Sequence, residues 1–123
     1  MAKYKYDIED RLIKFSVQII ILCNHKNQSF AVEHLAKQLI RSTTSAALNY
    51  GEAQSAQSPK DFLHKMRLCL KELRESLVNL KIQKGAKLTK DLEKFDELIK
   101  ENNQLIAIFV TSIKTSEQKN NLN

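Results

Sequence analysis

Along residues 35–53, the positions at alternating spacings of four and three lie on one face of a helix and form an unbroken stripe of leucine, small and polar side chains. Halfway along this face, leucine gives way to small and polar side chains. A neighbouring backbone can approach closely there, and the polar groups need hydrogen-bond partners inside a bundle. The face consists of Leu35, Leu39, Ser42, Ala46, Asn49 and Ala53. The segment therefore predicts a long helix that packs against other helices.

A first helix is predicted from Asp7, as its cap, to Cys23, and its apolar surface is unusually wide. The core stripe consists of Ile8, Leu12, Phe15, Ile19 and Leu22. Four more apolar residues lie beyond that stripe, namely Ile13, Val17, Ile20 and Ile21. Soluble monomers rarely expose a contiguous apolar patch of this kind, so we predict that these four residues form an oligomer interface.

Capping residues predict the next two helices. Ser29 follows the polar connection 24–28 and predicts a second helix that runs to about Gln57. The run 58–61, Ser-Pro-Lys-Asp, offers a capping serine, a proline at the first helical position and an acidic residue in the first turn of a third helix. Gly85 predicts the end of the third helix.

A fourth helix is expected from about Thr89, with Asp91 and Glu93 near the positive end of its dipole. The predicted core positions of the third helix are Phe62, Met66, Cys69, Leu73, Ser76 and Leu80. Those of the fourth are Leu92, Phe95, Ile99, Asn102, Ile106, Phe109 and Ile113. Residues after Ser116 are expected to fray.

Four long helices with short connections predict an all-α fold, an antiparallel up-down-up-down four-helix bundle. We expect a single domain at 1–116 and a disordered C-terminal tail at 117–123. Four seam residues are polar, namely Ser42, Asn49, Ser76 and Asn102. We interpret them as fixing the packing register at some cost in stability, and a ligand site among them is the alternative.

The composition supports helices, because the 123 residues include only two glycines and one proline. Cys23 and Cys69 lie far apart in the chain, which favours a reducing compartment over a disulfide scaffold. Residues 1–10 lack a signal-peptide pattern, and the apolar run 19–23 is far shorter than the roughly 20 residues a membrane span needs. We therefore expect a cytoplasmic protein that does not enter a membrane.

The formal net charge of +6 is concentrated in the third predicted helix and the loop after it. Residues 59–90 carry nine Lys or Arg and three Asp or Glu, whereas 1–58 and 91–123 have net charges of +2 and −2. Most of these cations lie on one exposed stripe interrupted by Val78. This basic ridge consists of His64, Arg67, Lys71, Arg74, Lys81, Lys84, Lys87 and Lys90. Such a row can follow a phosphate backbone, and a plain solvated helix face is the alternative.

Charges near the seams predict a polar contact between the second and third helices. Arg41 lies close to one seam, and Glu72 and Glu75 lie close to the other. We predict an ion pair between Arg41 and Glu72 or Glu75. A buried pair of this kind adds little net stability, but removing one partner leaves the other charge buried without a counterion.

No catalytic or metal-binding pattern is present in the sequence. Cys23 with His25, and the isolated His34 and His64, lack the spacing of metal ligands. Cys69 lies on a helix seam with no base proposed for it, so we interpret it as a small apolar residue. There is no glycine-rich phosphate loop and no nucleophile elbow. We predict no enzyme activity, no cofactor and no metal.

Short runs in the second and third helices form a recognisable motif. They are Arg41-Ser42, Thr44-Ser45, Asn49-Tyr50, Glu52-Ala53, Asp61-Phe62, His64-Lys65 and Lys71-Glu72. On these residues the chain resembles the bacterial 23S ribosomal RNA intervening sequence proteins, a four-helix-bundle family also labelled ribosomal protein S23. The motif residues that carry over, which we interpret as structural, are Arg41, Ser42, Ser45, Asn49, Glu52, Lys71 and Glu72.

The resemblance implies a homopentamer and a relation to the accessory variability determinant of diversity-generating retroelements. That protein is a basic pentamer that associates with nucleic acid and a reverse transcriptase. The resemblance implies no established activity for the intervening sequence proteins themselves. Two departures from the pattern affect close helix contacts: Thr43 and Ala47 stand where the family often has glycine, and Asn79 stands where a tryptophan is expected.

Three functions remain open from the sequence. The first is a non-enzymatic oligomer that binds RNA or DNA through the basic ridge. The second is a structural scaffold that binds a protein partner and no nucleic acid. The third, an enzyme, has no motif to support it. Nucleic acid that survives purification would favour the first, and a defined protein partner in its absence would favour the second.

Overall fold

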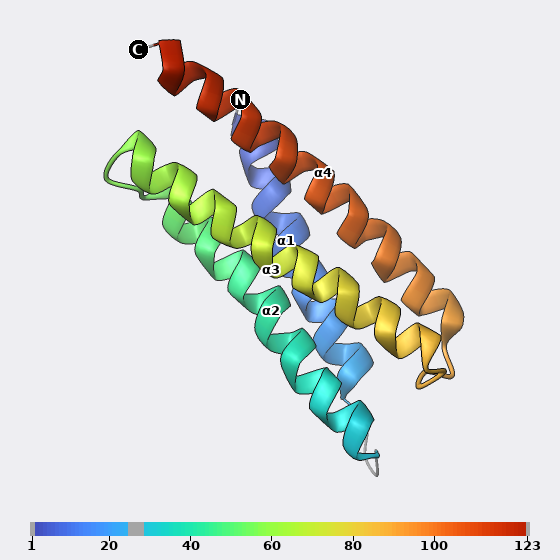
Figure 1. Cartoon of the computed structure of the whole chain (residues 1–123). Helices are drawn as coiled ribbons and strands as arrows, with labels where there is room; N and C mark the ends of the chain where they lie inside the picture. Colours follow the sequence, from blue (N-terminus) through green and yellow to red (C-terminus); the bar gives the residue numbers. More distant parts are fainter. Residues whose placement is uncertain (1, 25–28, 123) are drawn as a thin grey trace.

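The computed structural model describes residues 2–24 and 29–122, and this part of the chain contains four helices and no strand (Figure 1). The helices are α1 (Ala2–Cys23), α2 (Phe30–Gln54), α3 (Pro59–Gly85) and α4 (Leu92–Leu122). The fold is therefore all-α, as the apolar spacing predicts.

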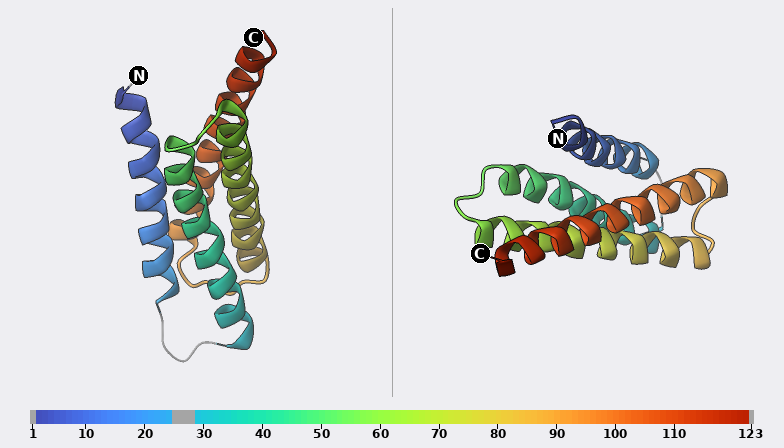
Figure 2. Two further views of the ribbon diagram at one scale, coloured as in Figure 1. Left: turned by 90° about the vertical axis from the view of Figure 1, so that its left-hand side faces the viewer. Right: turned by 90° about the horizontal axis from the view of Figure 1, so that it is seen from above.

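Each helix packs against two others. α1 contacts α2 and α4, and α3 contacts the same two helices. Both chain termini and the loop between α2 and α3 lie at one end of the bundle, and the loop between α3 and α4 lies at the other (Figures 1 and 2). The exposed face of α3 is consequently flanked by α2 on one side and by α4 on the other.

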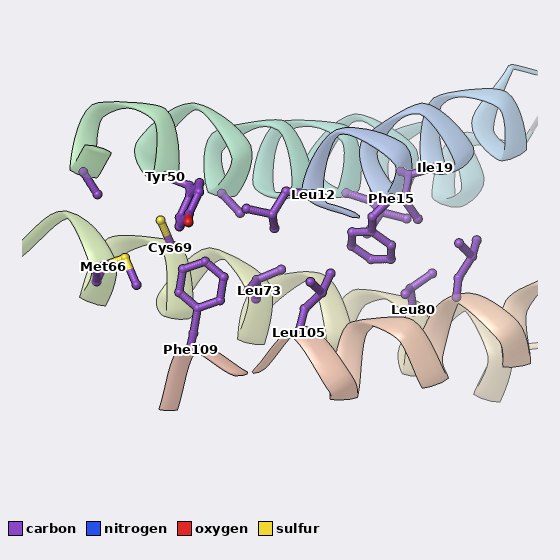
Figure 3. Packing of buried hydrophobic residues seen from close by; sticks show 14 of the residues in the cluster. Leu12, Phe15, Ile19, Tyr50, Met66, Cys69, Leu73, Leu80, Leu105 and Phe109 are labelled. Carbon is purple, nitrogen blue, oxygen red and sulfur yellow. The ribbon is translucent and has the colours of Figure 1, made fainter. Parts of the chain in front are cut away.

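The core is a continuous column of aliphatic and aromatic side chains from all four helices (Figure 3). Phe15 and Phe109 are its largest fully buried members, and the Tyr50 ring meets Phe109 edge-on with 5.7 Å between ring centroids. Burial of one such side chain contributes about 1.5–3 kcal/mol. This column confirms the predicted stripe of α1, in which Leu12, Phe15 and Ile19 are buried.

Two predicted helix starts are confirmed by their capping bonds. The Ser29 hydroxyl accepts a hydrogen bond from the Val32 amide at 3.3 Å, and the Ser58 hydroxyl accepts one from the Asp61 amide at 3.0 Å. Pro59 occupies the first turn of α3, as predicted. Each cap satisfies an amide that has no partner inside the helix. At the start of α4, the Asp91 carboxylate accepts a hydrogen bond from the Lys94 amide at 3.1 Å.

Other predicted boundaries are wrong. α1 begins at Ala2, so Asp7 lies inside the helix and is not its cap. α2 ends at Gln54, not at Gln57, and α4 continues to Leu122 through residues expected to form a disordered tail at 117–123. Nothing in residues 116–122 interrupts a helix, because the run contains no glycine or proline.

The core face of α4 is also rotated relative to the prediction. Leu98 and Leu105 are fully buried, whereas Ile99 and Ile106 are half-buried and Leu92 is exposed. Phe95, Asn102, Phe109 and Ile113 are buried as predicted. The predicted and observed faces share these residues, and the observed face has Leu98 in place of Ile99 and Leu105 in place of Ile106.

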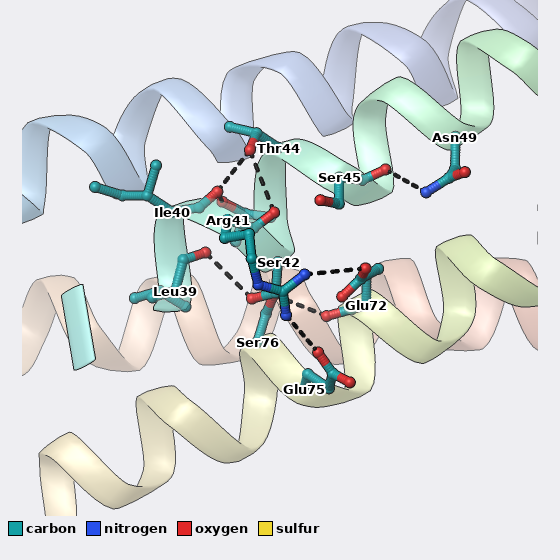
Figure 4. A network of polar contacts seen from close by, with 11 residues as sticks. Leu39, Ile40, Arg41, Ser42, Thr44, Ser45, Asn49, Glu72, Glu75 and Ser76 are labelled. Carbon is teal, nitrogen blue, oxygen red and sulfur yellow. Dashed lines mark hydrogen bonds and ion pairs between the residues drawn. The ribbon is translucent and has the colours of Figure 1, made fainter. Parts of the chain in front are cut away.

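The interior polar residues mostly pair with one another or with backbone. Ser42 and Ser76 share a hydrogen bond of 2.9 Å between their hydroxyl oxygens, which joins α2 to α3 (Figure 4). Asn102 Nδ2 donates to the Leu73 carbonyl at 3.0 Å, while its Oδ1 has no partner among the described residues. Asn49 is only half-buried and donates to the Ser45 carbonyl in its own helix, so the prediction of an interior Asn49 is wrong.

Asn79, which replaces an expected tryptophan, makes a further polar contact between α2 and α3. Its Nδ2 donates to the Leu35 carbonyl at 3.0 Å, and its Oδ1 accepts a hydrogen bond from Gln83 at 2.7 Å. Asn79 and Gln83 are both nearly fully buried. This contact fixes which turn of α2 lies beside which turn of α3.

α3 ends in a Schellman motif that the sequence does not reveal. The Leu88 amide donates to the Gln83 carbonyl and the Lys87 amide donates to the Lys84 carbonyl, so Lys87 occupies the position after the C-cap. Lys87 has a positive φ of 56°, a left-handed conformation that usually requires glycine. Gly85 is the last helical residue, as predicted, but it does not adopt the left-handed conformation.

Candidate nucleic-acid interface

The basic ridge lies on the exposed side of α3 and continues into the loop before α4. All eight of its residues are exposed: His64, Arg67, Lys71, Arg74, Lys81, Lys84, Lys87 and Lys90. The apolar seam of α3 points the other way, so helix periodicity keeps these cations out of the core. The structure thus places the predicted residues together along one side of the molecule.

Two of the ridge residues pair with acids on α4. Arg67 Nη2 lies 2.6 Å from a Glu117 carboxylate oxygen, and Lys84 Nζ lies 2.6 Å from an Asp96 carboxylate oxygen. The partners are about half exposed, and surface pairs of this kind contribute at most about 1 kcal/mol. A phosphate could therefore compete for either cation at little cost.

The middle of the ridge carries cations that have no ion pair within the described part of the chain. These are Lys71, Arg74 and Lys81, all on α3. They lie between the turns that hold Arg67 and Lys84, and Val78 stands among them with 56 % of its surface exposed. Three uncompensated positive charges on one helix face create a positive potential that attracts polyanions.

The predicted ion pair of Arg41 is confirmed, and it involves both acids (Figure 4). Arg41 Nη2 donates to Glu75 Oε2 at 2.9 Å, and Arg41 Nη1 donates to Glu72 Oε2 at 3.4 Å. The Glu72 side chain is 13 % exposed and the Arg41 side chain 58 % exposed. This pair joins α2 to α3 and neutralises acids that would otherwise weaken the potential of the ridge.

Burial controls the protonation of Glu72. Desolvation, with the neighbouring Glu75 carboxyl, raises the pKa of Glu72 above its ordinary value of 4.5, although the Arg41 charge opposes this shift. Conversely, the Glu72 charge is the main cause of a raised pKa for Arg41, which is a cation at any relevant pH. Glu72 Oε1 is buried without a hydrogen-bond partner among the described residues.

The other motif residues also make structural contacts. Ser42 pairs with Ser76 in the core, Ser45 offers its carbonyl to Asn49, and Glu52 forms a 2.8 Å ion pair with Lys65. These contacts lie within α2 or between α2 and α3. Among the described residues, Lys71 is the one motif member without a hydrogen bond or ion pair beyond the backbone bonds of its helix, and the structural role of the motif stays a prediction.

The predicted oligomer interface lies on the outside of α1. Ile13, Val17, Ile20 and Ile21 are exposed by 43–66 %. They occupy the side of α1 opposite Phe15 and Ile19, which face the core. The sequence reasoning missed another exposed leucine, Leu48 on α2, with 68 % of its surface accessible.

A second feature that the sequence reasoning missed is an exposed aromatic pair. Phe30 and His34, one turn apart at the start of α2, stack with their ring centroids 5.7 Å apart and their planes within 12°. Phe30 is 84 % exposed. In the sequence, only the spacing of four between Phe30 and His34 indicates that their rings can stack. Helix periodicity does not show which side chains of a bundle remain exposed to solvent.

The thiols are poor nucleophiles in this fold. Burial raises the pKa of the Cys23 thiol to about 11 and that of Cys69 to about 12, so both stay protonated at neutral pH. Across residues 2–24 and 29–122, no three His, Cys, Asp or Glu side chains converge as metal ligands do. His25, considered above with Cys23, lies outside the described residues. None of the four described helices is long and apolar enough to cross a membrane.

Comparison with known proteins places the chain in a family. Residues 5–111 match the model of the 23S rRNA-intervening sequence proteins. The chain belongs to this family. A solved structure of an S23 ribosomal protein family member of unknown function, from Bacteroides thetaiotaomicron, is similar throughout. It shares 26 % identity at a TM-score of 0.76, over 89 % of this chain and 97 % of that one. No curated protein matches the sequence.

Proposed function

We propose that this protein is a non-enzymatic oligomer that binds RNA or DNA through the basic ridge of α3. The observation that carries the proposal is the uncompensated row Lys71, Arg74 and Lys81 in the middle of that ridge. Cations of this kind supply the sequence-independent part of nucleic-acid affinity by displacing counterions from phosphates. Binding without strong sequence preference follows, because phosphate contacts carry no base information.

Assembly strengthens such contacts. The subunit is an antiparallel up-down-up-down bundle, in keeping with the positions of the helix ends in Figure 1. Subunits associate through the exposed side of α1 that holds Ile13, Val17, Ile20 and Ile21. A homopentamer, the state that family resemblance implies, would bring five ridges into one particle. Weak sites gain avidity when several engage one long polyanion at once.

The test is a fluorescence-anisotropy titration of labelled RNA and of duplex DNA with purified protein. A ridge variant, Arg67→Gln with Arg74→Gln and Lys81→Gln, should bind both at least about tenfold more weakly at low salt. The matched control removes the same charge elsewhere, from exposed lysines of α1 and α4: Lys14→Gln, Lys100→Gln and Lys114→Gln. Equal loss in the two variants would make the effect one of net charge alone and would contradict a specific role for the ridge.

A further inference from the structure

A groove lies between the exposed sides of α2 and α3, next to the basic ridge. Its volume is about 470 Å³, and it is lined by Leu35, Gln38, Arg74, Val78, Ile82 and the ion pair of Arg41 with Glu75, among others. Arg74 belongs to both the groove and the uncompensated row of the ridge. A ligand in the groove would therefore touch an unpaired cation.

The α3 side of the groove is partly apolar although it lies in a charged surface. Val78 and Ile82 follow Arg74 at spacings of four, so all three lie on one row of the helix. Their side chains stay 56 % and 50 % exposed. A phosphate backbone interacts favourably with cations and not with exposed aliphatic side chains, so phosphate binding alone gives Val78 and Ile82 no role.

The aromatic pair lies on the row of α2 side chains that reaches the groove at Gln38. Phe30, His34 and Gln38 follow one another at spacings of four, and Gln38 lines the groove. The hydrogen bond from Asn79 to the Leu35 carbonyl holds this level of α2 against the turn of α3 just before Ile82. Phe30 and His34 do not line the groove themselves; along the axis of α2 they lie beyond Leu35, toward the level of Ile82.

The charges around this face favour an anion. Arg74 and Lys81 have no ion pair among the described residues, whereas the nearby acids Glu72 and Glu75 are both engaged by Arg41. Lys37, on the outer side of α2, pairs with Glu33 in its own helix. The free charge next to the apolar and aromatic surfaces is thus positive.

We propose that this face binds unpaired nucleotides. Their bases would contact Phe30 and the exposed side chains of Val78 and Ile82, and their phosphates would contact Arg74 and Lys81. The inference rests on the proposed function and names its substrate class, a single strand in preference to a duplex. In a duplex the base faces are already stacked inside the helix, so exposed aromatic and aliphatic side chains have nothing to contact. A single strand offers those faces, and aromatic side chains bind them with little regard to sequence.

The first experiment compares oligouridylate, oligothymidylate and an RNA duplex of equal length in anisotropy titrations. Phe30→Ala should weaken binding of the single strands about fivefold or more, the lower end of what one stacked base contributes, and leave duplex binding unchanged. Phe30→Trp should retain wild-type affinity. The matched control is Leu92→Ala, another exposed apolar residue near a helix start, which should change neither affinity.

A second readout uses the absence of tryptophan from the chain. In Phe30→Trp the only indole reports on the proposed site, so oligouridylate should quench its fluorescence, whereas duplex RNA and polyglutamate should not. Comparison of oligouridylate with oligothymidylate shows whether the site prefers RNA or DNA.

The outcomes separate this inference from the proposed function. Unchanged single-strand binding by Phe30→Ala, or an equal loss of duplex binding, would overturn the assignment of unpaired nucleotides while the ridge proposal stands. Quenching by polyglutamate to the same extent would identify a general anion surface, open to acidic proteins, and would also overturn it. Failure of the wild-type protein to bind any of the nucleic acids would overturn both.

Discussion

Lys87 holds a backbone conformation that costs a non-glycine residue about 1–2 kcal/mol. Lys87→Gly should therefore raise the free energy of unfolding, by roughly 0.5–1 kcal/mol after the greater chain entropy of glycine is subtracted. Urea denaturation followed by circular dichroism measures this change. Lys87→Ala, which removes the same charge and keeps the Cβ atom, should be close to wild type. A Lys87→Gly variant less stable than Lys87→Ala would contradict the Schellman motif.

Glu72 gives the fold a distinctive pH dependence. Its folded-state pKa lies above the ordinary value of 4.5, so the folded chain binds the proton more readily than the unfolded chain does. The contribution of Glu72 to the free energy of unfolding therefore increases as the pH falls through the folded-state pKa toward 4.5. The same contribution is lost as the pH rises through the folded-state pKa. Glu72→Gln should remove this contribution.

The measurement for Glu72 is urea denaturation at several pH values between neutral and about 4.5. As the pH is lowered, the free energy of unfolding of wild type should increase relative to that of Glu72→Gln. Glu93→Gln, at an exposed position in the first turn of α4, is the control for the loss of one carboxylate. A difference that is constant across this range would show that burial does not perturb Glu72.

At the scale of the elements, capping accounts for how α3 begins. Ser58→Ala removes the hydroxyl that accepts a hydrogen bond from the Asp61 amide, and it should lower the free energy of unfolding by about 1 kcal/mol. Ser55→Ala is the control, because the Ser55 side chain forms no capping bond at the end of α2. The two variants are compared by thermal denaturation, and equal melting temperatures would mean that the cap contributes nothing.

Helix starts with a capping side chain were predictable, and helix ends without a stop signal were not. Ser29 and Ser58 mark α2 and α3 because each hydroxyl binds a specific amide. Asp7 looked like a cap, but the residues before it can also be helical, so α1 simply begins earlier. The Schellman end of α3 escaped prediction because Lys87 stands where glycine is usual.

The candidate site was predictable only as far as it lies on a single helix. The part of the ridge from His64 to Lys84 follows from the periodicity of α3 alone, and all eight ridge residues are exposed. The groove depends on the register of α2 against α3, which the Asn79 bond to the Leu35 carbonyl sets. No spacing within one helix contains that information, so Phe30 and Ile82 could not be related to each other from sequence.

At the scale of the whole molecule, the exposed side of α1 leads to a prediction about assembly. Light scattering at micromolar concentration should report a particle several times heavier than the 14.2 kDa chain. Replacing Val17 and Ile20 with lysine should dissociate it, because buried charges at an apolar interface cost several kcal/mol. The control, Lys14→Gln on the same exposed side, should leave the particle intact. A wild-type mass of 14.2 kDa would refute self-association.

The central claim is that the ridge binds nucleic acid by neutralising phosphates. The most direct test is the salt dependence of duplex binding, measured by anisotropy from about 50 mM to about 200 mM salt. The logarithm of the association constant should fall linearly with that of the salt concentration, and each phosphate contact should add about 0.9 to the slope. The variant Arg67→Gln, Arg74→Gln, Lys81→Gln should give a slope shallower by up to about 2.7 per subunit engaged. No wild-type binding near 50 mM salt, or an identical slope in the variant, would contradict the account and leave the ridge as a solvated helix face.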